Sequence, residues 1–461
     1  MIYRPAKGGL WDPSVIWHDG AYHAFMMYNQ DGPNGLEGQH CLWARSADGV
    51  HWHDEAVVIA EREPEKGNKF FKCFVGRCGD RFILDHGVQR REGQDTLRFY
   101  ESPDLRHWTY LFSSHPDPRW YVPTGRWDHM YILPKQEDDP GTGYWGYPVA
   151  TLQPGSGHGC GLAESTDGRA WSILPPPQFA WGDVPPVDLE IGGVERIGGR
   201  CVMIGGWAQY VSDGYSMYTL IADDPRGPFR PDPDAFRLCG TSTRAAGWGV
   251  SFLAAWCRGK DGELLISNYV AVPSGTWMLP MRKAVFDDGH LRLGWWPANA
   301  ALKGAPIALN LRQTRVNGCT WLEPKFDLAK GVVLEGTING VARGAGAAAG
   351  FAFAEAHGGA MEIRLGIGPA DGRETHVGRR HPLTGFSIED TTGRGCATVT
   401  GIGDGTTHAF RLLLRHDLFE LYVDDLLVQT YAYRPAGDAV GLVAHQADAI
   451  FDELTACAMT L

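Results

Sequence analysis

Features that mark membrane proteins and nucleic-acid-binding proteins are missing from this sequence. No apolar run is long enough to span a bilayer, and the segment after Met1 shows neither the apolar region nor the cleavage site of a signal peptide. Basic residues are in deficit, because 42 Lys and Arg stand against 54 Asp and Glu, a net charge of −12. Since nucleic acids require a basic surface, we expect no nucleic-acid partner. Because the sequence given shows neither a membrane-spanning run nor a signal peptide, we expect no membrane partner and a cytoplasmic location.

The sequence also lacks the cysteine patterns that hold metal ions. Its 10 cysteines are scattered, and none forms a Cys-x-x-Cys motif or a Cys/His pair with zinc-finger spacing. We therefore predict no metal site. Scattered thiols are typical of proteins kept in a reducing compartment.

Helical periodicity is scarce up to about Pro297, and short strand-like segments take its place. Most of these segments open with a Gly-containing turn, continue as an aromatic or β-branched run, and recur at intervals of roughly 55 to 65 residues. Five of them cover residues 19–28, 79–85, 143–149, 198–204 and 261–267. This pattern predicts a five-bladed β-propeller over residues 1–297, with one repeat in each blade.

A second repeat, of the form Ser-x-Asp-x-x-x-Trp, supports the blades. It occupies residues 46–52, 102–108 and 165–171, each time after a strand-like run. Its Asp can close a turn through the side chain, and its Trp can anchor the next strand. We interpret this motif as structural.

The pattern changes after residues 298–312, which we interpret as a linker. Beyond them, several segments alternate or run apolar over the length of a strand, and Asp424-Asp425 predicts a hairpin turn. The expected fold class is all-β, with the propeller followed by a C-terminal β-sandwich over residues 313–461. We expect the sandwich to buttress the propeller or to support a homodimer, rather than to bind polysaccharide by itself.

Three acidic residues, Asp12, Asp128 and Glu190, each stand just upstream of a repeated segment. If they occupy equivalent places in three blades, the rotation of a propeller brings them together at the centre of one face. A glycosidic bond is cleaved by two carboxyl groups, one ionised to attack the anomeric carbon or activate water, and one protonated for the leaving oxygen. A third carboxylate can raise the pKa of the proton donor and bind sugar hydroxyls. The three acids therefore predict a glycosidase site.

Each acid also has a structural interpretation. Asp12 could form an Asp-Pro turn, and Asp128 could pair with Arg126, because an unpaired Asp between aromatic residues is costly. Glu190 is flanked by apolar residues, which suits a carboxyl kept protonated by partial burial. Asp188 would share its face on a regular strand and is a rival for that role.

These residues carry a resemblance to glycoside hydrolase family 32, the β-fructosidases of clan J, over nearly the whole chain. Trp11-Asp-Pro13 with the strand that follows is similar to the opening of the family, whose Asp-Pro aspartate is the nucleophile. Arg126-Trp-Asp128 stands where the family has Arg-Asp-Pro, whose aspartate stabilises the transition state. Leu189-Glu190 stands where it has Glu-Cys, whose glutamate is the acid/base. Residues 43–52, 277–292 and 415–424 resemble further strands of its propeller and sandwich.

The sequence departs from the family at positions that surround the sugar. Where the family has Asn-Asp-Pro-Asn-Gly, Trp11 replaces the first Asn and Ser14 the second. One residue is inserted between Arg126 and Asp128, and Ile191 takes the place of Cys. The resemblance thus supports the reaction class better than it supports fructose as the sugar. The expected fold also resembles glycoside hydrolase family 43, which places two Asp and one Glu similarly, inverts the anomeric centre and prefers arabinose or xylose.

Further residues near the ends of the expected inner strands are candidates for contact with a sugar. They are Asn29, Gln30, Trp43, Arg126, His129, Trp207 and Trp248. Each could instead belong to packing or to a turn. Asp85 and His86 are interpreted as a satisfied polar pair at a strand end.

Together these observations predict a retaining, exo-acting glycosidase that removes a terminal furanose such as a β-fructofuranoside. Asp12 would be the nucleophile, Glu190 the acid/base and Asp128 the residue holding ring hydroxyls. The alternatives are an inverting arabinofuranosidase or xylosidase of the family 43 type and a carbohydrate-binding propeller without turnover. An oligo- or polysaccharide is the expected partner, and no cofactor is implied because carboxylates suffice.

Overall fold

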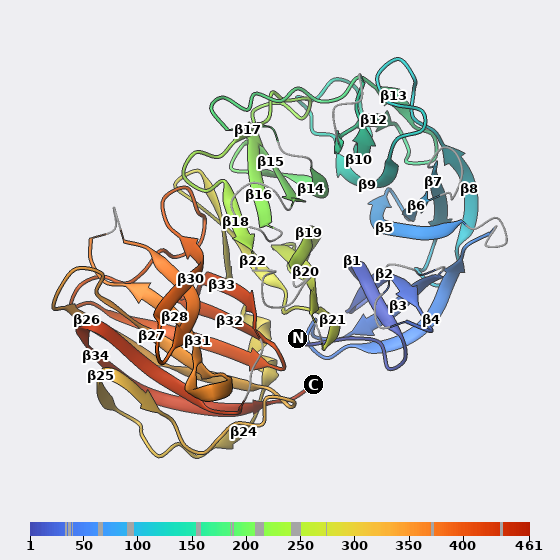
Figure 1. Ribbon diagram of the computed structural model, residues 1–461. Helices are drawn as coiled ribbons and strands as arrows, with labels where there is room; N and C mark the ends of the chain where they lie inside the picture. Colours follow the sequence, from blue (N-terminus) through green and yellow to red (C-terminus); the bar gives the residue numbers. More distant parts are fainter. Residues whose placement is uncertain are drawn as a thin grey trace.

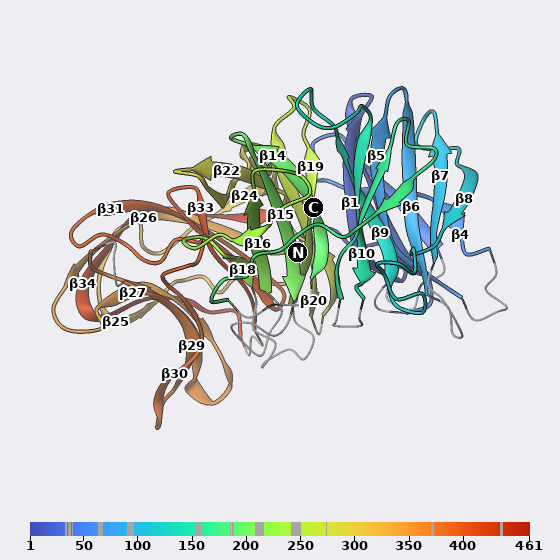
Figure 2. The same ribbon diagram turned by 90° about the horizontal axis from the view of Figure 1, so that it is seen from above.

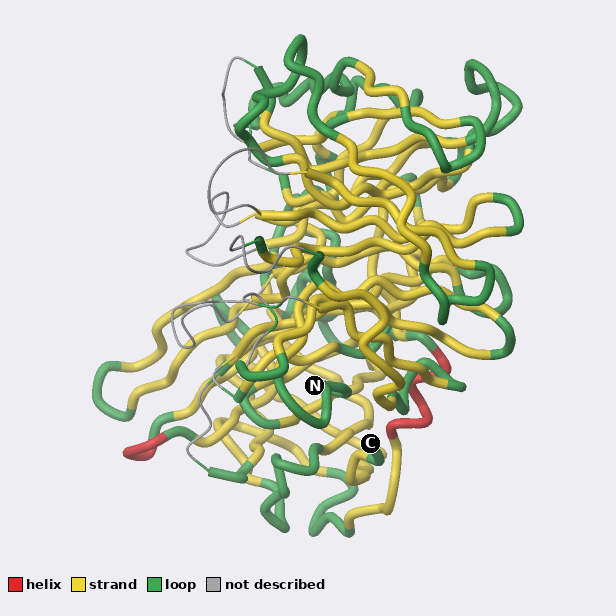
Figure 3. The backbone as a smooth tube through the Cα atoms, turned by 90° about the vertical axis from the view of Figure 1, so that its right-hand side faces the viewer, coloured by secondary structure: helices red, strands yellow, loops and turns green. Residues whose placement is uncertain are grey.

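The computed structural model describes the chain except residues 33–34, 36–37, 39, 63–67, 90–95, 154–157, 185, 187–188, 208–215, 241–249, 273, 370–372 and 434–436. The described residues form strands and two short 3-10 helices, η2 (Pro297–Leu302) and η3 (Ala356–Gly358) (Figure 3). Within the described part of the chain, no helix is both long and apolar enough to cross a membrane. All 10 cysteines are free.

The first part of the chain folds into five antiparallel blades arranged in a ring (Figure 1). Blade I consists of β1 (Gly9–His18), β2 (Ala21–Asn29), β3 (His40–Ser46) and β4 (His53–Ala60). Blade II consists of β5 (Lys69–Cys78), β6 (Arg81–Gln89), β7 (Thr96–Ser102) and β8 (Thr109–Ser114). Blade III consists of β9 (Trp127–Pro134), β10 (Tyr144–Thr151), β11 (His158–Cys160), β12 (Leu162–Ser165) and β13 (Ser172–Leu174). Blade IV consists of β14 (Glu190–Ile197), β15 (Arg200–Trp207), β16 (Ser216–Ala222), β17 (Arg230–Pro231) and β18 (Arg237–Gly240). Blade V consists of β19 (Val250–Arg258), β20 (Leu264–Val272), β21 (Gly275–Met278), β22 (Arg282–Asp287) and β23 (His290–Trp295).

The five repeated sequence segments form the second strand of each blade, namely β2, β6, β10, β15 and β20. Tight turns that need a positive φ explain the glycines at their starts. Asp19 and Gly20 (φ 44° and 74°) join β1 to β2, and Gly198 and Gly199 (φ 58° and 79°) join β14 to β15. The propeller predicted from the repeats is confirmed.

The Ser-x-Asp-x-x-x-Trp motif forms the turn between the last two strands of blades I, II and III. In blade I, the carboxylate of Asp48 accepts hydrogen bonds from the N–H groups of Val50 and His51, both 2.8 Å, and the Trp52 indole donates to Gly49 O at 3.0 Å. Asp104 with Trp108, and Asp167 with Trp171, make the equivalent contacts. The structural interpretation of this motif is confirmed.

The innermost strands β1, β5, β9, β14 and β19 surround the axis, and each contacts its neighbours around the ring. The ring closes where Tyr3 pairs with Met278 of blade V, so that the start of the chain is hydrogen-bonded to the last blade. This closure removes one open sheet edge and fixes the first blade against the fifth.

Each inner strand carries a β-bulge, where one more residue stands on it than on its partner strand. The bulges lie at Asp12–Pro13 of β1, Phe71–Lys72 of β5, His129 of β9, Gly192 of β14 and Leu253 of β19. Glycine is required in β14 because a Cβ on Gly192 would lie 1.9 Å from Ala254 O of the next blade. The bulges therefore accompany a very close approach of the strands at the axis.

Two backbone N–H groups of inner strands donate outside their own sheets to side chains of the preceding blade. Val75 N–H donates to Ser14 Oγ at 3.1 Å, across blades II and I. Met130 N–H donates to Asp85 Oδ1 at 2.7 Å, across blades III and II. Asp85 is fully buried, and burial raises the pKa of its carboxyl well above the usual value, against the opposing effect of the Met130 N–H. The predicted satisfied pair at a strand end is met only in part, because Asp85 and His86 lie within β6 and Asp85 Oδ2 and His86 Nε2 are buried without a hydrogen-bond partner among the described residues.

The rest of the chain forms the sandwich, which lies beside blades IV and V (Figures 1 and 2). Its strands are β24 (Lys303–Ile307), β25 (Thr314–Trp321), β26 (Val332–Ala342), β27 (Ala348–Ala354), β28 (Ala360–Gly366), β29 (Thr375–His381), β30 (Gly385–Thr392), β31 (Thr407–Arg415), β32 (Leu418–Val423), β33 (Leu426–Ala432) and β34 (Val440–Met459). Asp424 and Asp425, with φ of 49° and 60°, form the predicted hairpin turn. Strand β24 falls within the segment predicted as a linker and pairs with β34, so that part of this segment belongs to the sandwich sheet.

Two contacts fasten the sandwich to the propeller. Gly294 of β23 pairs with Leu426 of β33, which continues the sheet of blade V into the sandwich. Arg282 of blade V donates from Nε to Glu420 Oε1 at 2.8 Å, and both side chains are fully buried. Replacing either partner alone would leave an uncompensated buried charge.

We predict that Asp85 stabilises the propeller through its acceptor oxygen alone. Asp85→Leu should lower the free energy of unfolding by about 1–3 kcal/mol, because the Met130 N–H loses its acceptor in a buried site. Asp85→Asn keeps that oxygen and serves as the matched control, with a much smaller loss. Urea denaturation of the three proteins measures the difference. Equal stability of the Leu and Asn variants would contradict this role.

Candidate active site

The structure brings Asp12, Asp128 and Glu190 to the inner strands of three blades. Asp12 lies at the bulge of β1, Asp128 is the second residue of β9 and Glu190 is the first residue of β14. All three are buried, with 6%, 2% and 8% of their surface exposed. The Asp188 alternative lies outside the described residues.

Arg126 links two of these acids. Its Nη2 donates to Asp128 Oδ2 at 2.5 Å and to Glu190 Oε2 at 3.0 Å, and its Nη1 donates to Glu190 Oε1. Its backbone is fixed by Thr151 of β10, whose hydroxyl accepts from Arg126 N–H at 2.8 Å. The predicted ion pair between Arg126 and Asp128 is present, and the same guanidinium also grips both oxygens of Glu190.

Asp12 has a strained backbone and a perturbed carboxyl. Its φ of 49° is unusual for a residue other than glycine, and the bulge at this position aims its side chain. Burial raises the pKa of Asp12 to about 7, Lys72 opposes the rise, and the charges of Glu190 and Asp128 add to it. The charges of these two carboxyl groups therefore reach Asp12 from blades III and IV. Oδ1 of Asp12 is buried and accepts no hydrogen bond from the described residues.

Asp128 is held as an anion. Although burial opposes ionisation, the charge of Arg126 and the contacts with His129 keep the pKa of Asp128 well below its usual value. His129 N–H donates to Asp128 Oδ1 at 2.7 Å. Gly87 of β6 makes room for this carboxylate, because a Cβ there would lie 2.4 Å from Asp128 Oδ1.

Lys72 is a charged residue of this site that the sequence interpretation missed. It lies in the bulge of β5, is only 5% exposed, and donates from Nζ to Ile191 O at 3.4 Å. Burial lowers the pKa of Lys72, whereas the charges of Asp12, Glu190 and Asp128 raise it. A single lysine inside the apolar run Phe70–Val75 was the available signal, since a buried cation needs compensating charge.

His129 lies beneath the acids rather than at the surface. It is 2% exposed, and its Nε2 donates to Ile191 O at 2.8 Å, the same carbonyl that accepts from Lys72. His129 and Lys72 line a cavity of about 10 Å³ together with Ser14 and Phe74. Such a volume holds about one water molecule. His129 of blade III and Lys72 of blade II are therefore both hydrogen-bonded to Ile191 of blade IV, and the His129 N–H positions Asp128.

The other residues predicted to contact a sugar are placed as follows. Asn29 pairs with Gly9 at the start of β1 and accepts a hydrogen bond from Asp31 N–H at 3.1 Å, while Gln30 is exposed beside it. Trp43 is buried in blade I, stacks on His23 and donates to its Nδ1 at 3.0 Å, so that it serves packing. The backbone of Trp207 follows Gly206, which pairs with Glu190. Trp248 lies outside the described residues.

The site combines three carboxyl groups with two cations, Arg126 and Lys72, and the pKa values of Asp12 and Asp128 are shifted in opposite directions. A carboxyl group whose pKa is near 7 and another held ionised can perform different steps of acid–base or nucleophilic chemistry. Among the described residues, no cluster of His, Cys, Asp and Glu is arranged to hold a metal ion.

Comparisons with known proteins were made for the sequence and for the fold. No protein-family model matches the chain. Invertase 1 of Saccharomyces cerevisiae is 37% identical over 71 residues, a match that covers 14% of this chain and only 13% of the length of that relative.

Solved structures match along the full chain. Fructan 1-exohydrolase IIa of Cichorium intybus superposes with a TM-score of 0.71 at 14% identity, covering 99% of this chain and 96% of the other. The family 32 β-fructofuranosidase of Bombyx mori gives a TM-score of 0.69 at 13% identity, covering 99% and 92%. Exo-inulinase of Aspergillus awamori gives 0.64 at 14% identity, covering 100% and 97%. The predicted resemblance to glycoside hydrolase family 32 is confirmed, and over its whole length the chain has the propeller and β-sandwich fold of that family's β-fructofuranosidases.

Proposed function

We propose that this protein is a retaining, exo-acting glycoside hydrolase that removes terminal furanosides such as β-fructofuranosides. The observation that carries the proposal is the group of three buried carboxyl groups on the inner strands of three blades, two of them joined by Arg126 and both of these acting on the pKa of Asp12. The likeness of the fold to β-fructofuranosidases supports the same reaction class.

In this proposal Asp12 is the nucleophile. It attacks the anomeric carbon in its ionised form, so its pKa of about 7 sets the acid side of the activity profile. Lys72 favours that ionised form and so supports attack. Asp128, held ionised by Arg126, accepts hydrogen bonds from ring hydroxyls.

Glu190 is the acid/base. In the first step it passes a proton to the leaving oxygen while Asp12 forms the glycosyl–enzyme bond, and in the second step it takes a proton from the water that breaks that bond. Both oxygens of Glu190 accept from Arg126 in this structure. Arg126 must therefore release one of them before Glu190 can serve the leaving group, and Arg126 acts as a positioning residue.

Oligosaccharides are the proposed substrates. One structure of the Bombyx mori enzyme contains sucrose, and one of the fructofuranosidase of Schwanniomyces occidentalis contains fructosylnystose. Trp11, Ser14 and Ile191 replace residues of the family pattern around the sugar. These replacements keep open an inverting pentosidase of the family 43 type, and the engagement of both Glu190 oxygens keeps open sugar binding without turnover.

A substrate panel separates the three functions. We expect hydrolysis of sucrose, inulin or levan, with the anomer of the product retained in an NMR time course. Hydrolysis of nitrophenyl arabinofuranoside or xyloside with inversion would identify the pentosidase instead. Sugar binding by calorimetry without hydrolysis of any panel member would identify the binding protein.

The role of Glu190 predicts a dependence on the leaving group. Glu190→Gln should abolish turnover of natural substrates with poor leaving groups and spare activated aryl glycosides to a greater extent, because the latter need little protonation. The measurement is kcat/KM on both substrate types, with Glu164→Gln, a partly exposed glutamate of blade III, as the matched control. Equal losses on both types would exclude Glu190 as the acid.

The position of Lys72 predicts a shift in the pH profile. Lys72→Met removes the charge that opposes protonation of Asp12, so the acid limb of kcat/KM should move to higher pH by roughly one unit or more. Lys283→Met, at an exposed position of blade V, should leave the limb in place.

Stability provides a second readout of the same interaction. Because the folded-state pKa of Asp12 is raised, the stability it contributes is fully present below its unfolded value of 3.8 and is lost as pH rises through about 7. Lys72→Met should enlarge that loss between pH 5 and pH 8. An unchanged acid limb and an unchanged loss of stability would show that Lys72 does not act on Asp12.

A further inference from the structure

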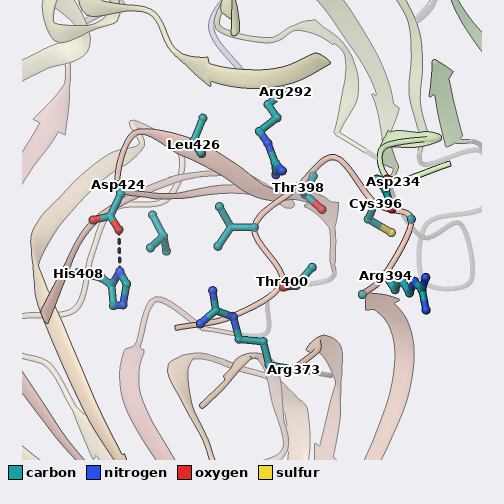
Figure 4. A pocket seen from close by; sticks show the side chains of 15 residues that line it. Asp234, Arg292, Arg373, Arg394, Cys396, Thr398, Thr400, His408, Asp424 and Leu426 are labelled. Carbon is teal, nitrogen blue, oxygen red and sulfur yellow. Dashed lines mark hydrogen bonds and ion pairs between the residues drawn. The ribbon is translucent and has the colours of Figure 1, made fainter. Parts of the chain in front are cut away.

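A second cavity lies at the seam between the propeller and the sandwich, away from the three acids. Its volume is about 400 Å³, and its lining comes from blades IV and V and from the sandwich residues 393–401, which connect β30 to β31 (Figure 4). Cavities of this size accommodate small organic ligands.

Two arginines face this cavity from different elements. Arg292 belongs to β23 of blade V, and Arg373 precedes β29 of the sandwich. In Figure 4 they lie on opposite sides of the pocket, with Thr398 and Thr400 between them. Arg292 donates to Ala397 O and Arg373 to Gly368 O, each at 3.3 Å. A guanidinium group has five N–H donors, so these contacts with backbone carbonyls leave further donors of both arginines for an anion.

Buried polar atoms in the lining lack partners as well. Arg373 Nε and Thr398 Oγ1 are buried and make no hydrogen bond with the described residues. Thr398 is only 4% exposed. Buried donors are rarely left unsatisfied in folded proteins, so a partner at this place is expected to come from a ligand or from water.

The acidic groups of the lining are engaged elsewhere or exposed. Asp424 accepts from His408 Nδ1 at 2.6 Å and from Ala409 N–H at 2.9 Å. His408 Nε2 accepts from Gly403 N–H at 3.0 Å. Asp234 is exposed at the rim. Arg394 also lines the pocket but is exposed, so Arg292 and Arg373 supply the positive charge of its partly buried part.

The walls are held by backbone hydrogen bonds. Ala397 N–H donates to Arg237 O at 2.9 Å, Val399 N–H to Leu427 O at 3.0 Å, and Ile402 N–H to Gly366 O at 2.9 Å. Arg237 is itself buried against Asp390 at 2.7 Å. A pre-formed wall reduces the entropy lost when a ligand binds.

We propose that this seam pocket binds a small phosphate ester, whose phosphate is recognised by Arg292 and Arg373. Planar guanidinium groups match the oxygens of a phosphate, and two of them offset its double charge. The cavity exceeds the needs of inorganic phosphate, and the hydroxyls of Thr398 and Thr400 provide partners for the rest of the ester. This proposal is independent of the glycosidase activity.

Isothermal titration of the full-length protein tests the proposal with glucose 6-phosphate, inorganic phosphate and glucose at constant ionic strength. We expect the ester to bind, inorganic phosphate to bind more weakly, and glucose to give no signal. Arg292→Gln and Arg373→Gln should each weaken ester binding by about ten- to hundredfold, as for the loss of a charge-assisted contact. Lys330→Gln removes one exposed charge from the same domain and should have no effect.

Two further measurements keep the proposal testable if a variant is unstable. Arg373→Lys retains the charge and should bind with intermediate affinity, and the ester should raise the thermal unfolding temperature of the unaltered protein more than equimolar sulfate does. Inorganic phosphate binding as tightly as the ester would support the phosphate site with free phosphate as its ligand. Absence of binding, or equal affinity in the two Gln variants and the unaltered protein, would overturn the proposal.

Discussion

The geometry of the active site depends on how closely the five inner strands approach the propeller axis. Each inner strand carries a bulge, and at the bulge of β14 only glycine fits against the next blade. Asp12 and Lys72 lie in two of these bulges, and Ser14 and Asp85 accept backbone N–H groups of the next blade. Close packing and chemistry are thus two results of one arrangement.

The electrostatics of the site follow from that packing. Three carboxyl groups are placed in a region of low dielectric, where the charges of Glu190 and Asp128 raise the pKa of Asp12 further. Arg126 donates hydrogen bonds to both Asp128 and Glu190. The charge of Lys72 lowers the pKa of Asp12, which burial nevertheless raises to about 7. The two buried aspartates, Asp12 and Asp128, therefore have pKa values shifted in opposite directions because their charged neighbours differ.

Much of the fold was readable from the sequence, because most of the five second strands share a Gly-containing turn followed by an aromatic or β-branched run. The acids were also found, since charged residues between aromatic or apolar neighbours stand out. Lys72 was missed because its place at the axis depends on a bulge, which no residue type announces. The packing role of Trp43 and the pairing of β24 with β34 depend on long-range contacts, and sequence pattern does not encode these partners.

The seam between the two parts of the chain has a consequence for its evolution. Gly294 and Leu426 share one sheet, and Arg282 lies buried against Glu420 of the other part. A foreign propeller or sandwich would therefore have to supply the matching partner, because Arg282 or Glu420 buried alone at this seam is an uncompensated charge.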